Sequence, residues 1–524
     1  MADSSKPPLR VGIVTTWIES AYWTVLISGL VDGLREAGAH VLCFTLGLPG
    51  RGGATASDAT DPFYELCTSE SVSGLVVLSS ASFSQASEEF CDRRRGLPMV
   101  SVGQRVPGVP SVWMHNAAGI RKMVDHLVDN CGRRRIAFIR GPEANGEAEA
   151  RFRAYEDMCV ERSLSLESTL VEMGNFTESS GQRAAERLLE RNQSTLPDAI
   201  MAANDLMARG AERALRNLAL RVPDDIAVVG FDDLEASLSD PPLTTVRQPV
   251  YELGKRAAEL LLAQLRGETV PEHVLFPPEI VVRASCGCTV SEVTSAAELV
   301  SRHRAGAPRL FAGQQKEPAE GSGSDEVLPL VQALRQEVLP NLRHKPDTQG
   351  RVARILEAIE ILARDSASEA LNYQRAIETA RKQALTRIRW RTTHATNLPA
   401  LLEHLAEILP ALNIDGFFVS LFEGRPGPID TARLVFAYHD GREIPVQPGG
   451  ANFPARRLVP GYLARSAPSG TSLVHPLETD GALIGFVIMH GEVYDAQLLS
   501  DVCHLLSAAL DRLQALNGQA GLEA

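Results

Sequence analysis

The chain has 524 residues, of which 44% are hydrophobic and 22% charged, and its formal net charge is −13. This length predicts two or three domains, and the composition is typical of a globular protein with a sizeable core. The acidic balance argues against a broad nucleic-acid-binding surface, because phosphate binding requires clustered Lys and Arg side chains.

The sequence shows no segment that would direct it into or across a membrane. Its first apolar run, residues 11–15, is too short for a secretory signal, and no stretch approaches the roughly 18 apolar residues of a membrane span. The eight cysteines are mostly scattered singly, which suits a reducing compartment. We therefore predict a cytoplasmic protein.

Cys286 and Cys288 form the one close cysteine pair, with a single residue between them. Structural zinc sites usually combine two Cys or His pairs, and no second pair lies nearby in the sequence. We therefore expect neither a metal nor a cofactor.

Residues 9–288 alternate short apolar runs with amphipathic stretches such as 21–37. Apolar strands between helices predict an α/β architecture, with parallel sheets that helices cover on both faces. In such sheets ligands bind beyond the carboxyl ends of the strands, so the loops that follow the strands are the candidate site. The predicted strands are 9–14, 41–45, 74–78, 98–102, 135–139, 199–202 and 226–230.

The composition shifts after residue 288. Residues 289–325 are predicted to be a linker, because 305–325 are rich in Gly, Pro, Ala and Ser. Apolar spacings of three and four in 326–395 predict a helical connector, either a hairpin packed on itself or a coiled coil between two chains. Residues 397–516 combine a helix, several strands and a last helix, which predicts a small α+β domain.

Five motifs stand in the order that one known family shows. They read NAAG (116–119), GRRRIAFI (132–139), NDLMARG (204–210), VPDDIAVVGFDD (222–233) and PLTTVRQP (242–249). Residues 9–288 therefore resemble the ligand-binding core of the LacI/GalR repressor family.

The resemblance implies a two-lobed, periplasmic-binding-protein-like core that closes on a sugar, a nucleoside or a similar polar metabolite. It also places a ligand-binding arginine at Arg151. Polar side chains at other strand ends and aromatic side chains after the first strand complete the prediction. The predicted ligand-binding residues are Trp17, Tyr22, Trp23, Ser79, Arg151, Phe176, Asn204, Asp205, Asp232 and Gln248.

Some of these residues also have structural interpretations. Arg151 could pair with Glu147 or Glu149 on an exposed helix face. Asn204 and Asp205 could cap the helix that follows them, and capping is compatible with ligand contact.

The remaining candidates have alternatives of the same kind. Asp232 and Asp233 could form a plain turn, and Trp17 and Trp23 could belong to a core between the lobes. Gln248 could be a hinge residue.

Two features depart from the family. His115 stands where an aspartate is common, which puts in doubt a ligand or hinge contact at that position. Repressors of the family carry roughly sixty residues of DNA-binding and hinge sequence before the core. Eight residues precede the first predicted strand here, so operator binding by the usual route is not expected.

Residues 397–516 resemble a divergent GAF-type domain in the order of their elements and in the apolar segment 476–486. Similar domain orders often end in a nucleotide cyclase or a kinase, but no motif of those enzymes and no P-loop occurs in the sequence. His394 is interpreted as an exposed connector residue. The basic stretch 381–391 is interpreted as an exposed helix face, with contact to nucleic acid or an acidic partner as the alternative.

The predicted function is a ligand-sensing regulator that relays lobe closure through the connector to a downstream partner. The alternative is a transcriptional regulator that contacts DNA directly or through a partner subunit. An enzyme is not predicted, because Asp232 and Asp233 would point opposite ways in an extended chain and no nucleophile with an oriented base is evident. The resemblance favours a homodimer, and no membrane contact is expected.

Overall fold

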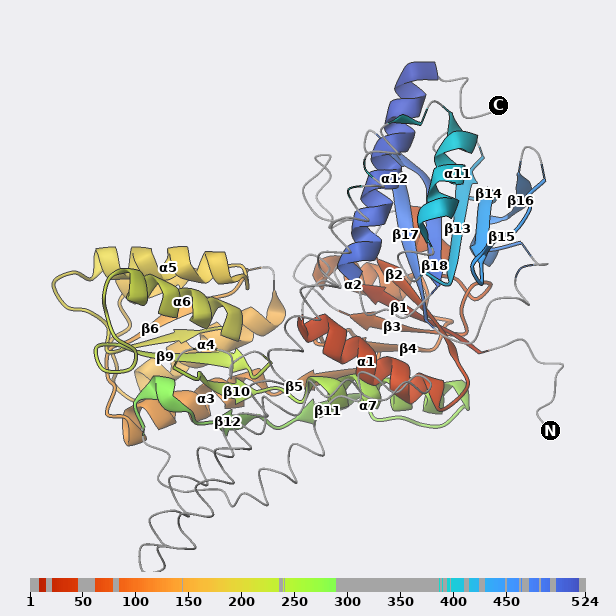
Figure 1. Cartoon of the computed structure of the whole chain (residues 1–524). Coiled ribbons are helices and arrows are strands. Elements are labelled where there is room, and N and C mark those ends of the chain that lie inside the picture. Colours follow the sequence, from red (N-terminus) through yellow and green to blue (C-terminus); the bar gives the residue numbers. More distant parts are fainter. Residues whose placement is uncertain are drawn as a thin grey trace, which may run out of the picture. The chain divides into compact units, whose positions relative to one another are not determined.

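The computed structural model describes most of residues 9–288 and 397–517 (Figure 1). The described residues are 9–15, 21–45, 62–78, 84–143, 145–234, 239, 241–288, 386, 389, 394–395, 397–409, 414–423, 429–447, 450–460, 463, 471–479, 482–490 and 496–517. Contacts divide the chain into one unit that joins Met1–Ser291 to His394–Ala524 and a second unit, Glu292–Thr393. Trp17, Ser79, the predicted linker and nearly all of the predicted connector lie outside the described residues.

The first lobe is built on a parallel sheet whose strand order is β11-β5-β4-β3-β1-β2. Helices α1 and α7 pack closely on each other, since a Cβ on Gly29 would lie 2.1 Å from the Tyr251 carbonyl oxygen. The elements are β1 (Arg10–Thr15), α1 (Ala21–Arg35), β2 (His40–Thr45), β3 (Gly74–Leu78), α2 (Ser84–Asp92), β4 (Met99–Val102), β5 (Ser111–Met114), α7 (Val250–Leu265) and β11 (His273–Phe276).

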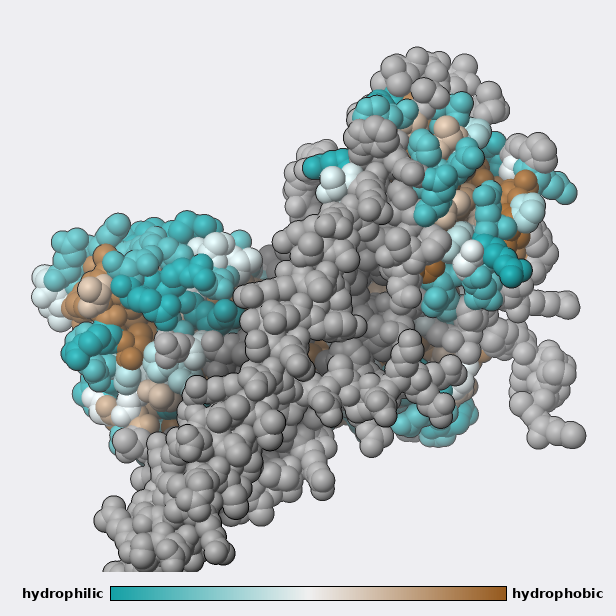
Figure 2. All heavy atoms as spheres, in the orientation of Figure 1, coloured by the Kyte–Doolittle hydropathy of each residue, from teal (hydrophilic) through white to brown (hydrophobic). Residues whose placement is uncertain are grey.

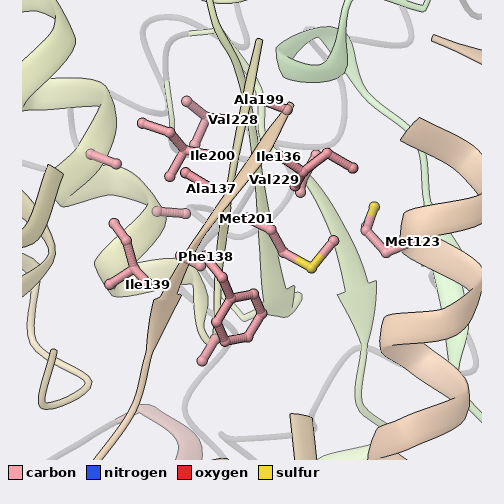
Figure 3. Close-up of a cluster of buried hydrophobic side chains, with 14 of the residues drawn as sticks. Met123, Ile136, Ala137, Phe138, Ile139, Ala199, Ile200, Met201, Val228 and Val229 are labelled. Atoms are coloured by element: carbon pink, nitrogen blue, oxygen red, sulfur yellow. The ribbon is translucent and has the colours of Figure 1, made fainter. Parts of the chain in front are cut away.

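The second lobe has a six-stranded sheet of order β12-β10-β9-β8-β6-β7, which is parallel except for β12. Its central strands are buried along their length, which explains their continuous apolar sequences (Figure 3). The elements are α3 (Asn116–Asp125), β6 (Ile136–Arg140), α4 (Gly146–Glu161), β7 (Val171–Met173), α5 (Glu178–Arg191), β8 (Ala199–Ala202), α6 (Asp205–Asn217), β9 (Ala227–Asp232), β10 (Thr244–Arg247) and β12 (Glu279–Val281).

The helices of the second lobe begin at capping side chains. Asn145 caps α4, Thr177 caps α5 and Asn204 caps α6, each accepting a hydrogen bond from a backbone N–H in the first turn. Helices α5 and α6 bury one apolar face, and their outward faces are hydrophilic (Figure 2). The predicted α/β architecture is confirmed, and every predicted strand of residues 9–288 is present.

The C-terminal region is an antiparallel α+β arrangement of order β17-β18-β13-β14-β15, with β16 paired to β14. The predicted helix, strands and last helix are all present, and the GAF-like identity stays a prediction. The elements are α11 (Leu398–Ile408), β13 (Gly416–Phe422), β14 (Thr431–His439), β15 (Arg442–Glu443), β16 (Ala451–Pro454), β17 (Thr471–Thr479), β18 (Ala482–His490) and α12 (Ala496–Asn517).

The C-terminal region continues the sheet of the first lobe, which the sequence did not predict. Strand β17 pairs in parallel with β2, so that both regions share one 12-stranded sheet. At this junction His40 Nε2 lies 3.0 Å from Ser472 Oγ, and Thr45 Oγ1 lies 2.9 Å from His475 Nδ1. Apolar side chains of both regions, such as Phe44 and Val474, belong to one core cluster.

Burial lowers the pKa of His40 to about 4 and that of His475 to about 3. Below about pH 6.5 the unfolded chain binds protons that these rings do not, so stability should fall as the pH drops toward 4. We expect a loss of about 1–2 kcal/mol per histidine between pH 7 and pH 5. Denaturant unfolding at the two pH values measures it.

The double variant His40→Asn, His475→Asn should lose most of this pH dependence. His115→Asn is the matched control, because His115 is exposed and Asn retains its ability to cap α3. An unchanged pH dependence in the double variant would contradict the assignment.

Candidate ligand-binding site

The carboxyl ends of β8 and β9 lie side by side in the second lobe, because these strands are neighbours in the parallel sheet. Helices α3 and α4 also pack against each other there. Four of the eight described candidate residues lie at the ends of these strands or on these helices, namely Arg151, Asn204, Asp205 and Asp232.

Arg151 is the centre of the polar cluster, and only 3% of its side chain is exposed. Its Nε donates a 2.7 Å hydrogen bond to Asn116 Oδ1, and its Nη1 donates one of 2.7 Å to the carbonyl of Ala203. The guanidinium carbon lies 3.8 Å from the centre of the Phe231 ring. Asp232 Oδ1 is 3.7 Å from Nη1. A buried cation is thus contacted by three other segments of the second lobe, namely α3, the end of β8 and the end of β9.

The interpretation of Arg151 as an exposed helix-face residue is wrong. Glu149 pairs instead with Arg140 at 2.9 Å and with Arg153 at 2.8 Å. Glu147 accepts a 3.3 Å hydrogen bond from Asn116 Nδ2.

Asp232 adopts an unusual backbone conformation, with a φ of +123°. Residues other than glycine are strained at such positive φ values. This backbone strain persists only where surrounding contacts hold the residue in place, and it is often found at functional sites. Gln248 Nε2 donates a 2.6 Å hydrogen bond to Asp232 Oδ1, and the backbone N–H of Gln248 donates to the carbonyl of Asp232 at 3.0 Å.

The pKa of Asp232 is raised to about 7. Burial is the main cause and Glu147 adds to it, whereas the charge of Arg151 and the hydrogen bond from Gln248 act in the opposite direction. The carboxyl can therefore change its charge near neutral pH.

Asp233 plays a different part from its neighbour. Its φ is +60°, and its carboxylate oxygens each accept a 2.7 Å hydrogen bond, one from Arg247 and one from Arg283. From the sequence, the two carboxylates were expected to point opposite ways on an extended chain. The chain is not extended here, and the two carboxylates have different partners. The pair is unsuited to catalysis that needs two facing carboxylates.

Gln248 presents an unpaired acceptor. Its side chain is 5% exposed, and within the described residues its Oε1 is buried and accepts no hydrogen bond. Buried polar atoms are usually paired, so an orphaned acceptor beside Asp232 suits a ligand hydroxyl or N–H group. The hinge interpretation of Gln248 stays open.

Tyr22 brings an aromatic side chain of α1 to the same cluster. Its pKa is raised well above 10, first by burial and then by the charges of Glu147 and Asp232. Trp23 packs edge-on against it, with ring centres 5.2 Å apart. The carboxyls of the second lobe are therefore close enough to Tyr22 for their charges to act on its pKa.

Asn204 and Asp205 have structural contacts within the second lobe. Asn204 caps α6 and donates from Nδ2 to the carbonyl of Phe176 at 3.1 Å. Asp205 accepts from Thr245 Oγ1 at 2.6 Å and from the backbone of Asp233 at 2.8 Å. Their ligand contacts, and that of the half-buried Phe176, stay predictions.

The predicted ligand-binding residues did not include Asn116, Glu147 or Phe231. Asn116 and Phe231 lie within the family motifs 116–119 and 222–233, so their position was a usable signal. Glu147 was considered only as an ion-pair partner of Arg151. His115 serves as the cap of α3, where its side chain accepts a hydrogen bond from Ala118.

Two α/β lobes with polar side chains gathered at strand ends define a periplasmic-binding-protein-like sensor module. A family model described as a periplasmic binding protein-like domain matches residues 124–286. The regulators reg1 of Streptomyces lividans and MalR of Streptomyces coelicolor are 31% and 32% identical, each over 54% of this chain and 82% of their own length. The chain belongs to the LacI/GalR family.

Other similar proteins match a smaller share of this chain. The regulator CelR of Thermobifida fusca is 38% identical over 36% of this chain, and the match spans 57% of its length. A solved complex of a transcriptional regulator CelR with cellobiose is 30% identical over 53% of this chain and 86% of its own, with a TM-score of 0.46. These relatives are named as transcriptional regulators and not as enzymes. Among the described helices, none has the length and apolar character needed to cross a membrane.

Asp232→Asn should change how stability depends on pH. The folded protein keeps a proton on Asp232 that the unfolded chain releases near pH 4, so this stabilisation is lost as the pH rises through about 7. The variant lacks that loss. Its stability relative to the unmutated protein should therefore rise by about 2–3 kcal/mol between pH 5 and pH 8.

Thermal or denaturant unfolding of both proteins at the two pH values measures this difference. Asp157→Asn, on the exposed side of α4, is the control and should show no such trend. Parallel pH profiles for Asp232→Asn and the unmutated protein would refute the raised pKa.

Proposed function

We propose that the chain is a cytoplasmic ligand-sensing regulator that binds a small polar metabolite, of sugar or nucleoside type, at the Arg151 cluster. The observation that carries this proposal is a buried guanidinium beside a carboxyl of raised pKa and an unpaired Gln248 oxygen. Such a set offers donors and acceptors in fixed positions, which is what a polyol or a heterocycle needs.

The aromatic side chains support the same class of ligand. Tyr22 and Trp23 offer flat apolar faces beside the polar groups, and sugar C–H groups or a base can pack on such faces. Because Tyr22 belongs to the first lobe and Arg151 to the second, a ligand that contacts both would favour one arrangement of the lobes. That difference in affinity is what a ligand-driven switch requires.

The output of the sensor is part of the proposal. The connector at 326–395 relays lobe closure to a downstream partner, and the family membership favours a homodimer. The shared sheet at β2 and β17 gives the C-terminal region, which we propose to be GAF-like, a direct contact with the first lobe.

Thermal unfolding against a panel of mono- and disaccharides, sugar phosphates, nucleosides and purines tests the proposal. A ligand at a hundred times its dissociation constant stabilises the folded state by about 2.7 kcal/mol, which should raise the unfolding midpoint by several degrees. Arg151→Met and Asp232→Ala should abolish this rise.

Arg153→Met is the matched control on the same helix, because 73% of its side chain is exposed, and it should retain the rise. If no panel member stabilises the protein, or if Arg151→Met retains the full rise, the proposed site is wrong.

A second candidate is a transcriptional regulator that contacts DNA directly or through a partner subunit. It is favoured by the relatives, which are named as transcriptional regulators. A mobility shift against sheared genomic DNA at moderate salt should then show a complex that ligand weakens or strengthens. No complex with the purified chain would exclude direct contact, and the partner route would then be tested by co-purification with DNA-binding subunits.

A further inference from the structure

A second cluster lies in the second lobe, away from the Arg151 site. His126, Cys131, Cys286 and Cys288 each offer one ligand atom, and these four atoms all lie within 4.8 Å of one another. His126 Nε2 is 3.4 Å from the sulfur of Cys131 and 3.4 Å from that of Cys286. Three cysteines and one histidine are a ligand set that structural zinc sites use, so the cluster is a candidate metal site.

A π-helical turn brings His126 and Cys131 together. Residues five apart on an α-helix differ by about 140° in direction, so they face different sides. Here His126–Asn130 form a π-helix, and the backbone N–H of Cys131 donates to the carbonyl of His126 at 3.2 Å. The wider turn places both side chains on one face, and such turns are frequent at functional sites.

The other two ligand atoms come from a tight turn some 155 residues further along the chain. Gly287 lies between the cysteines with a φ of +89°, a conformation that glycine adopts without strain. Ser285 anchors the turn, since its hydroxyl donates to the carbonyl of Val228 at 2.6 Å and accepts from the backbone of Thr244 at 2.8 Å. The turn is thus fixed independently of any metal.

We propose that His126, Cys131, Cys286 and Cys288 bind one structural zinc ion. A tetrahedral zinc with bonds of about 2.0 Å to nitrogen and 2.3 Å to sulfur separates its ligand atoms by roughly 3.5–3.8 Å. The observed 3.4 Å contacts and the 4.8 Å limit fit that tetrahedron after small side-chain shifts. All four positions are supplied by protein, which is the closed arrangement of structural rather than catalytic sites.

The chemistry of the ligands favours zinc. Three thiolates and one imidazole are soft ligands, whereas magnesium and calcium prefer oxygen. Three thiolates around a divalent ion leave one negative charge, and a cation adjoins it: the guanidinium of Arg133 lies 3.2 Å from where a Cβ on Gly287 would stand.

The site would tie the end of helix η5 (Ala284–Cys286) and the residues just after it to helix α3 and the turn that follows α3. The zinc would therefore hold Cys286 and Cys288 against the turn that carries His126 and Cys131. This inference does not depend on the proposed ligand.

Metal analysis of the full chain, purified without chelator and with any histidine tag removed, tests the proposal. We expect about one zinc per chain, and its loss in the double variant Cys286→Ser, Cys288→Ser. Cys159→Ser is the control, since Cys159 is buried in the same lobe outside the cluster, and it should retain the metal.

Cobalt substitution of the unmutated protein gives a second measurement that does not require folded variants. Tetrahedral thiolate ligation should produce a thiolate-to-cobalt charge-transfer band and intense d–d bands. Chelation should lower the unfolding midpoint, and zinc but not magnesium should restore it. The assignment would be overturned if the protein is purified metal-free and shows no such bands with cobalt. It would also be overturned by a disulfide within the cluster under reducing conditions, or by full zinc content in the double variant.

Discussion

The buried guanidinium of Arg151 sets the geometry of the second lobe around the candidate site. Taking a charge out of water costs several kcal/mol unless hydrogen bonds and nearby charge replace the lost hydration. Here Asn116, the Ala203 carbonyl and Asp232 supply that replacement, and the Phe231 ring covers one face. These partners come from α3, the end of β8 and the end of β9. The charge is therefore tolerated only while the helices and strand ends keep their positions, and this rigidity is what a binding site needs.

Asp232 is held by its surroundings in a backbone conformation and an environment that are unfavourable for an ionised aspartate. Its backbone is strained and burial opposes its charge. Contacts of the next residue, Asp233, hold the backbone in this conformation. Arg247 and Arg283 donate to the Asp233 carboxylate, and the Asp233 backbone N–H donates to the Asp205 carboxylate. The contacts of Asp233 thus fix the end of β9, and the carboxyl of Asp232 is left facing Arg151 and Gln248. Strained backbone and raised carboxyl pKa values cluster at functional sites, and both observations at Asp232 support the proposed ligand contact.

Much of this architecture could be predicted from sequence, and the exceptions share a cause. The strands of residues 9–288 were predicted because buried parallel strands appear in sequence as continuous apolar runs. Arg151 was predicted from the family resemblance, and Asp232 from its position just after the strand 226–230. The cluster of His126, Cys131, Cys286 and Cys288 was missed, since its two halves lie far apart in the chain and one half depends on a π-helical turn that composition does not reveal. The pairing of β2 with β17 was missed for the same reason, because the sequence of neither strand indicates which distant strand it pairs with.

That pairing changes how a signal could leave the first lobe. An edge strand of a sheet has unpaired backbone groups that attract another strand, and β17 occupies the edge of β2. Thr15 at the end of β1 pairs with Thr45 at the end of β2, and the hydroxyl of Thr45 contacts the buried His475 of β17. Strand β1 precedes α1, which carries Tyr22 into the Arg151 cluster. The C-terminal region is therefore packed onto the same sheet as the first lobe, and this shared sheet supports the proposal that a ligand which moves the first lobe also moves this region.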